Sequence, residues 1–202
     1  DDNLNCVLMP SQYSSKSSVE DAIELCKKFD IKHEIVSIEP MLSAYLKNMD
    51  ENSLRIGNFS ARLRMSVLYD ISARENSLVV GTSNKSELLL GYGTIFGDLA
   101  CAINPIGDIY KSDLFEFAKY LGENDSIVKK APSADFYEGQ SDEADLGYSY
   151  SKIDSLLKKM IDENRSKDEL LALGFEDEFI ETIKKRVKIN EFKRRLPIVA
   201  KI

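Results

Sequence analysis

The 202-residue sequence contains a single histidine and only three cysteines, and this scarcity argues against two kinds of site. His33 has no second imidazole with which to share a zinc ion, and both zinc chemistry and a Ser/His triad are therefore disfavoured. The cysteines Cys6, Cys26 and Cys101 are odd in number, widely spaced and set among apolar neighbours. We expect three small buried side chains rather than a disulfide or a metal centre.

Long apolar runs and an excess of positive charge are also missing. No run approaches the roughly 20 residues needed to span a bilayer, and the opening DDNLNCVLMP lacks the basic flank of an export signal. We therefore expect no membrane segment and a cytoplasmic location. The net charge of −7 argues against nonspecific nucleic-acid binding, because a phosphate polymer is held by summed cationic contacts. The basic stretch from Lys184 to Arg195 fits either a solvated helix face or a local anion site.

The first half of the sequence alternates predicted strands with predicted helices. Apolar and β-branched runs predict strands over residues 5–9 and 32–38, and helical spacing predicts helices over 19–29, 41–48 and 57–75. The continuous run SLVV at 77–80, bounded by Gly81, suits a central strand covered on both faces. These alternations predict an α/β fold with a doubly wound parallel sheet.

After Pro105 the pattern becomes helical. Helices are expected over residues 111–121, 126–130, 153–163, 167–173 and 176–191. Between them, residues 132–147 form an acidic, polar stretch that suggests a flexible loop. We expect one domain over residues 1–202, in which residues 150–202 form a C-terminal helical part; a hydrophobic content of 43% is enough for such a core.

The segment from Gly81 to Lys111 places turn residues, a carboxylate, an amide and a lysine directly after the predicted central strand. Ligands of parallel sheets gather where strands end, and the first strand also ends in a polar stretch, LMPSQYSS. The hydroxyls of Thr82 and Ser83 could hold phosphate oxygens, and Glu87, one helical turn beyond Ser83, could hold a magnesium ion. The alternative is a capping box with Ser83 as the cap.

Three further charged residues each admit two interpretations. Lys111 opens a predicted helix, where a cation opposes the helix dipole, so it indicates a nearby anion unless it is an ordinary surface lysine. Asp98 lies among glycines in GTIFGD and could contact a ligand or form an Asx turn. Arg62 could be a surface residue or a fork that binds a carboxylate.

Five blocks, spread in order over nearly the whole chain, resemble ammonia-dependent NAD synthetase of the epsilonproteobacterial type. They are GNFSARLRM (57–65), GTSNKSELLLGYGTIFGD (81–98), PIGDIYK (105–111), KKAPSAD (129–135) and QSDEADLGYSY (140–150). The resemblance implies an adenine nucleotide alpha hydrolase-like fold and a C–N bond-forming ligase. In that family Mg2+-ATP adenylates the nicotinate carboxylate of deamido-NAD, pyrophosphate leaves, and ammonia attacks to give NAD and AMP. Family members are homodimers, so we expect a dimer that uses the helix from Gly57.

The resemblance also assigns residues, position by position. It implies ATP contacts for Leu8, Met9, Thr82, Lys111 and Ser133, deamido-NAD contacts for Arg62, Asp98, Phe192 and Lys193, and magnesium ligation by Glu87. Partners outside this chemistry, such as nucleic acid or a membrane, are not implied.

Two departures from the family pattern leave alternatives open. The Ser-Gly-Gly-x-Asp-Ser loop that binds pyrophosphate is not among these 202 residues and would precede Asp1, so we expect a fragment of a longer chain or a truncated product. Phe192 stands where many relatives carry histidine. A dimer that binds dinucleotide without turnover, and a GMP synthetase-like or tRNA-modifying relative, remain alternative functions.

Overall fold

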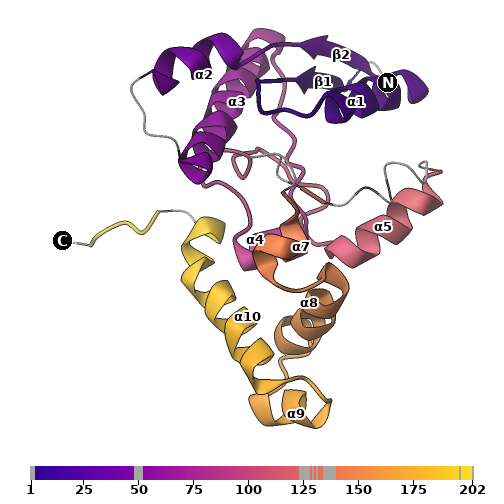
Figure 1. The fold of residues 1–202 in the computed structure, drawn as a ribbon, viewed down its shortest axis with the longest axis vertical. Coiled ribbons are helices and arrows are strands. Elements are labelled where there is room, and N and C mark those ends of the chain that lie inside the picture. Colours follow the sequence, from indigo (N-terminus) through magenta and orange to yellow (C-terminus); the bar gives the residue numbers. More distant parts are fainter. Residues whose placement is uncertain are drawn as a thin grey trace.

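The computed structural model describes residues 3–47, 52–122, 128, 130, 132–133, 140–195 and 197–201. Figure 1 shows the strands and the N-terminal helices in the upper part of the molecule and the remaining helices below them, with α4 (Lys85–Leu90) near the junction. The upper part contains β1 (Asn5–Leu8), α1 (Lys16–Lys28), β2 (Lys32–Ile35), α2 (Glu39–Leu46) and α3 (Ser53–Glu75).

The lower part is helical within the described residues. Its elements are α4 (Lys85–Leu90), α5 (Lys111–Tyr120), α7 (Asp142–Leu146), α8 (Tyr150–Leu157), the π-helical η1 (Lys158–Asp162), α9 (Lys167–Ala172), α10 (Asp177–Ile189) and the 3-10 helix η2 (Glu191–Arg194).

The sheet is parallel, as the sequence predicts. β1 pairs with β2 in the register Asn5↔Lys32 to Leu8↔Ile35, and α1 provides the crossover between them. Such a crossover is the usual way to join adjacent parallel strands, because their ends lie at opposite edges of the sheet. The prediction of an α/β fold with a parallel sheet is therefore confirmed.

The predicted central strand over residues 77–80 is the part of the sheet that differs from expectation. Of these four residues, only Val80 forms a β-type pairing in the described structure, an isolated parallel bridge to Ile103. Two backbone bonds hold this bridge, from Gly81 N to the Ile103 oxygen at 2.7 Å and from Ala102 N to the Val79 oxygen at 2.9 Å. The chain turns after residue 103, so the pairing does not extend into a ladder. Within the described residues, the run SLVV is extended backbone with one bridge rather than a full strand.

Local capping explains the boundaries of the long upper helices. α1 begins after Ser15, whose side chain accepts the Ser18 N–H, and the chain leaves it through Asp30 at φ 50°. α3 begins after Asn52, whose side chain accepts the Arg55 N–H, and ends at Asn76 in the left-handed region, also at φ 50°. Asparagine and aspartate tolerate this conformation better than most residues. α3 therefore starts four residues before the predicted helix and ends where expected.

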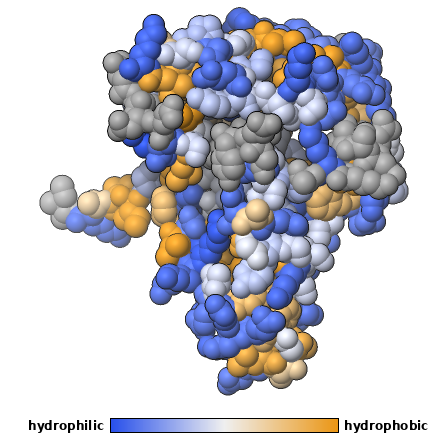
Figure 2. All heavy atoms as spheres, viewed as in Figure 1, coloured by the Kyte–Doolittle hydropathy of each residue, from blue (hydrophilic) through white to orange (hydrophobic). Residues whose placement is uncertain are grey.

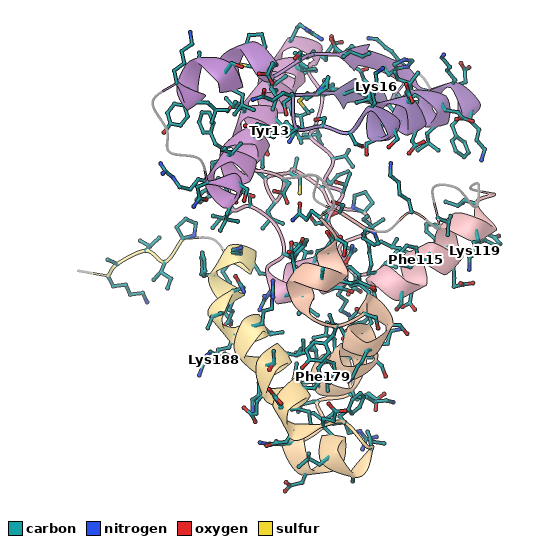
Figure 3. All side chains as sticks on the ribbon, viewed as in Figure 1. Tyr13, Lys16, Phe115, Lys119, Phe179 and Lys188 are labelled. Carbon is teal, nitrogen blue, oxygen red and sulfur yellow. The ribbon has the colours of Figure 1, made fainter. Side chains whose placement is uncertain are left out.

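The largest apolar core lies in the lower part. It is formed by Leu90, Tyr110, Leu146, Tyr150, Ile153, Leu156, Leu157, Leu170, Phe179, Ile180 and Ile183. In Figure 3 Phe179 projects from α10 toward α8, whereas Lys188 projects outward from the same helix. Phe179 has an exposed fraction of 0%, and its ring centroid lies 4.5 Å from that of Tyr148. One apolar face of α10 is thus buried, as its sequence pattern predicts.

Two predictions need correction, and a third falls largely outside the described residues. α7 occupies residues 142–146, where the sequence suggested a loop, and the predicted helix over 153–163 is α8 followed by the π-helical η1. Of the predicted helix over 126–130, only residues 128 and 130 are described.

Among the described helices, no segment has the length and apolar character that a bilayer crossing requires. The surface in Figure 2 alternates hydrophilic and hydrophobic patches, and the C-terminal tail stands clear of the body at the left. Ile198 and Val199 in that tail are 97% and 83% exposed.

Candidate functional site

A cleft of ≈ 1670 Å³ lies between the upper part and the lower helices. Its walls come from the end of β1, from α1, α3 and α10, from the turn before α4, and from the loop between Gly91 and Ala100. Typical ligand pockets measure about 300–1,000 Å³. The cleft is therefore large enough for a ligand bigger than a single small molecule.

The turn before α4 is built around a capping box. Asn84 is the cap: its side chain accepts the Glu87 N–H at 3.0 Å, while Glu87 Oε2 accepts the Asn84 N–H at 3.1 Å. The proposed capping box is therefore present, but with Asn84 rather than Ser83 as the cap. The remaining oxygen of Glu87 faces Lys111, and both Thr82 and Glu87 line the cleft. Capping and a place in the cleft are thus compatible for Glu87.

Lys111 enters the cleft from the first turn of α5. Its Nζ lies 3.0 Å from Glu87 Oε1, and the two side chains are 21% and 15% exposed. The same ammonium group lies 5.5 Å from the centroid of the Tyr150 ring. The anion that a lysine at a helix start indicates is therefore the partly buried carboxylate of Glu87, which compensates the charge of Lys111.

The loop between Gly91 and Ala100 holds Asp98 at the floor of the cleft. Asp98 Oδ1 accepts the Thr94 N–H at 2.9 Å, from a residue four positions earlier, whereas the side chain of an Asx turn accepts an N–H two positions later. The side chain is open to solvent from the cleft, but the protein surrounds it on most sides, and this desolvation raises its pKa. Arg62 Nε donates to the Ile95 carbonyl at 3.3 Å, behind this loop.

The C-terminal segment reaches the same loop through Lys193. Its Nζ donates to the carbonyl oxygens of Gly91 at 2.7 Å and Gly93 at 2.9 Å, which follow the end of α4. Burial lowers the pKa of Lys193, although the charge of Asp98 opposes this effect. Phe192 is 58% exposed and is not among the described residues that line the cleft.

The end of β1 is fixed by a residue that sequence reasoning did not select. Arg64, on α3, donates from Nε to the Met9 carbonyl at 3.1 Å and from Nη2 to Ser14 Oγ at 3.3 Å. Met9 and Arg64 line the cleft, whereas Leu8 lies within β1 and does not. Nothing in the spacing of Arg64 distinguishes it from Arg62, so the sequence offered no signal for this role.

Asp142 is a second residue that sequence reasoning passed over. It is 4% exposed, and its Oδ2 accepts the Tyr150 hydroxyl at 3.2 Å. Among the described residues, its buried Oδ1 has no hydrogen-bond partner. Burial raises its pKa, while Tyr92, Lys111 and Tyr150 act in the opposite direction. Its backbone N–H donates to the Pro132 carbonyl at 2.8 Å and so holds the chain next to Ser133.

Seven of the ten predicted site residues lie around this one cleft, and three do not. Those that line it are Met9, Thr82, Glu87, Asp98, Lys111, Ser133 and Lys193. Leu8, Arg62 and Phe192 are absent from the described lining. Within the described residues, no group of three or more His, Cys, Asp or Glu side chains is arranged to hold a metal ion. Two lysines and a hydroxyl-bearing turn suit an anionic, phosphate-bearing ligand, whereas the carboxylates suit a cation bound with it.

Comparison with known proteins gives consistent results from sequence and structure. A sequence model of the family NAD synthase matches residues 1–197. A Wolinella succinogenes protein named NH(3)-dependent NAD(+) synthetase is 52% identical over 202 residues, which is 100% of this chain and 79% of the relative. The Campylobacter jejuni protein of the same name is 50% identical, again over 100% of this chain and 80% of the relative.

Two solved structures resemble the fold over most of its length. The NH3-dependent NAD synthetase from Campylobacter jejuni, in complex with the nitrate ion, has a TM-score of 0.82 at 43% identity and covers 98% of this chain and 78% of that one. The NMN synthetase from Francisella tularensis has a TM-score of 0.85 at 32% identity, with coverage of 98% and 79%. With a family match across residues 1–197 and relatives at 50% identity or above over its whole length, the chain belongs to the NAD synthase family.

Proposed function

We propose that the protein is an ATP-dependent NAD synthetase that uses ammonia. It adenylates the nicotinate carboxylate of deamido-NAD, releases pyrophosphate, and lets ammonia displace AMP to give NAD. The observation that carries the proposal is the meeting of Thr82, Glu87, Lys111 and Ser133 on one cleft, although they come from three separate stretches of the sequence. The names of the relatives at 50% and 52% identity support the same reaction.

The ATP side of the cleft is assigned to the turn before α4, the start of α5 and the end of β1. In this proposal Lys111 and Ser133 contact phosphate oxygens, and Thr82 belongs to the same side; all three residues line the cleft. A lysine ammonium and a serine hydroxyl lower the energy of the negative charge that builds up on a departing pyrophosphate. The backbone beyond Leu8, at Met9, would run beside the adenine.

The deamido-NAD side is assigned to the loop around Asp98 and to the C-terminal segment. Lys193 lines the cleft there, and its ammonium group is already fixed on the carbonyls of Gly91 and Gly93. Arg62 and Phe192 lie outside the described lining, so for them contact requires a ligand that extends beyond the cleft or a second subunit. We assign the dinucleotide to this end of the cleft.

Magnesium is the metal that the proposed reaction requires. The described residues offer no cage of three ligands, but magnesium is commonly held by one or two carboxylates together with substrate phosphates. Glu87 meets that requirement, because its carboxylate lines the cleft and its Oε1 is bound by the side chain of Lys111, which a metal ion could displace. When bound, the ion would neutralise part of the triphosphate charge. The residues present therefore fit magnesium through Glu87.

A twofold dimer completes the proposal. Two apolar side chains of α3 are exposed, Leu54 at 63% and Tyr69 at 40%, and a second copy would cover them. Obligate dimer interfaces are more apolar than the rest of a protein surface. Analytical ultracentrifugation should then give twice the mass of one chain. A Tyr69→Arg variant should shift it toward the monomer; Tyr69 lies outside the described lining of the cleft, whereas Leu54 is part of it.

The reaction is tested by direct product analysis. Protein incubated with deamido-NAD, ammonium and Mg2+-ATP should form NAD, AMP and pyrophosphate in equal amounts. Lys111→Ala should raise the KM for ATP, whereas Lys119→Ala, an exposed lysine on the same helix, should not. Formation of ADP and phosphate instead, or equal KM values for both variants, would refute the assignment.

A second substrate is favoured by one specific observation, the TM-score of 0.85 to a protein titled NMN synthetase. That protein shares 32% identity with this chain, against 52% for the relative named NAD synthetase. Nicotinate mononucleotide carries the same carboxylate on a smaller molecule. Comparing kcat/KM for the two acceptors decides between them, and we expect the dinucleotide to be preferred.

A further inference from the structure

We infer that Asp154, a buried carboxylate on α8, is a positioning residue for the ATP-binding lysine: it fixes the first turn of α5 and thereby the place of Lys111. The inference rests on the proposed function, in which Lys111 contacts the triphosphate. Asp154 itself lies outside the described lining of the cleft and would not touch substrate.

The starting point is a helix without a cap of its own. The N-cap of α5 is Tyr110, and its side chain makes no capping hydrogen bond. The first N–H groups of a helix have no partner within the helix, so they need acceptors from elsewhere. Lys111, the first residue of α5, adds a positive charge at the end of the helix where the dipole is also positive. The sequence next to α5 therefore provides no side-chain acceptor at its N-cap, although Asp113 places one acidic residue in the first turn.

Two side chains from other helices supply what α5 lacks. Ser86 Oγ, from α4, accepts the Lys111 N–H at 2.9 Å, and Asp154 Oδ2, from α8, accepts the Ser112 N–H at 2.8 Å. Ser86 Oγ in turn donates to Asp154 Oδ1 at 2.6 Å. Ser86 is 0% exposed and Asp154 is 1% exposed. Both carboxylate oxygens are thus committed, and together the two side chains cap α5 from outside.

The same arrangement holds Lys111 at both of its ends. Its backbone N–H is bound to Ser86, and its Nζ is bound to Glu87, the next residue of α4, at 3.0 Å. A lysine side chain is flexible, so its ammonium group is placed reproducibly only if its backbone is fixed relative to its partner. Asp154 fixes the position of α5 relative to α4, because it binds Ser86 of α4 and the Ser112 N–H of α5 at the same time.

A charged acceptor suits this position better than a neutral one. A carboxylate at a helix N-terminus gains from the helix dipole, and charge-assisted hydrogen bonds are shorter and stronger than neutral ones. Without the carboxylate, Ser86 would lose its acceptor, and the partly buried Ser112 N–H would lose its acceptor as well. The first turn of α5 would then be free to shift, and with it the ammonium group that faces the phosphates.

The test is the affinity for ATP in the Asp154→Asn variant, measured by calorimetry in the absence of the acceptor and ammonia. An amide retains one acceptor oxygen but cannot accept from both Ser86 and Ser112, so we expect the Kd for ATP to rise by roughly tenfold. Activity should show the same rise in the KM for ATP, with the KM for ammonium unchanged. Asp162→Asn is the matched control. Asp162 binds the side chains of Lys85, at the start of α4, and Tyr110, just before α5, whereas Asp154 binds a backbone N–H of α5.

A double-mutant cycle separates positioning from general destabilisation. If Asp154 acts through Lys111, the variant carrying both Lys111→Ala and Asp154→Asn should bind ATP no more weakly than Lys111→Ala alone. Additive losses, or full ATP affinity in Asp154→Asn, would overturn the inference. If Asp154→Asn does not fold, Ser86→Ala takes its place in the same cycle. Normal ATP affinity in Lys111→Ala would instead contradict the proposed function.

Discussion

The guanidinium of Arg64 donates to the carbonyl oxygen of Met9 across 3.1 Å and so ties the middle of α3 to the loop that follows β1. A second bond to Ser14 Oγ spans the same loop, which forms one wall of the cleft. Arginine presents several donors in a rigid plane, and this geometry lets one side chain hold two points of a loop.

Replacement of Arg64 by lysine should therefore loosen the adenine end of the cleft. A lysine has no Nε–H in the position that contacts Met9, so we expect the KM for ATP in Arg64→Lys to rise by about three- to tenfold. The KM for deamido-NAD should change little. Steady-state kinetics with each substrate varied in turn checks this, and Arg55→Lys, an exposed arginine on the same helix, serves as the control. Equal effects on both KM values would contradict the assignment.

Glu87 has a structural counterpart that makes its functional role testable. Ser166 and Glu169 form a capping box on α9, in the same pattern as Asn84 and Glu87 on α4, but away from the cleft. Glu87→Ala and Glu169→Ala should both lower Tm, because each removes the reciprocal bond of its box.

Only Glu87→Ala should reduce NAD formation, by about 100-fold, since it also removes the carboxylate that binds Lys111 and that we propose as the magnesium ligand. Differential scanning calorimetry and initial rates on the same preparations give both quantities. Near-normal turnover in Glu87→Ala would leave that residue with capping alone.

Lys193 and Arg194 both bind carbonyl oxygens around the end of α4, but only Lys193 lines the cleft. Arg194 donates to Leu88, Leu89 and Val187, on the side away from the cleft. Lys193→Met and Arg194→Met should therefore both loosen the C-terminal segment. The KM for deamido-NAD should rise only in Lys193→Met, by about tenfold. A similar rise in the arginine variant would indicate that loosening of the segment, rather than a ligand contact, sets this KM.

Asp142 should give the protein a measurable pH dependence of stability. Burial raises its pKa from 3.8, so the folded protein binds this proton more tightly than the unfolded chain. Its favourable contribution is complete below pH 3.8 and is lost as the pH rises through the raised pKa. The difference in the free energy of unfolding between the wild type and Asp142→Asn should follow that course. Urea denaturation of both proteins at a series of pH values measures it, and a difference that is constant with pH would contradict the argument.

Local patterns in the sequence predicted most of the helices and both strands of the sheet, because apolar spacing and capping residues act over a few positions. The missed α7 is an instructive exception. Its five residues are too few for an apolar period, yet Ser141 caps its start and Gly147 ends it at φ 79°. Serine before and glycine after a short acidic stretch were signals that could have found it.

The site was predictable only where it coincided with recognisable motifs. The turn before α4 and the lysine that opens α5 could be selected from the sequence because their neighbours are unusual. The bond between Ser86 and Asp154 joins residues 68 positions apart, and that between Arg64 and Met9 joins residues 55 positions apart. Such pairs depend on how helices pack in three dimensions, and no local spacing encodes them.

The uneven distribution of buried side chains implies that some elements of the fold unfold locally more readily than others. All residues of β1 and β2 are at least partly exposed, whereas α8 and α10 each contain several apolar side chains that are 0–1% exposed. Amide hydrogens of the two strands should exchange with deuterium well before those of α8 and α10. A nucleotide bound in the cleft should slow exchange mainly in the strands, because the buried side chains of α8 and α10 already protect those helices.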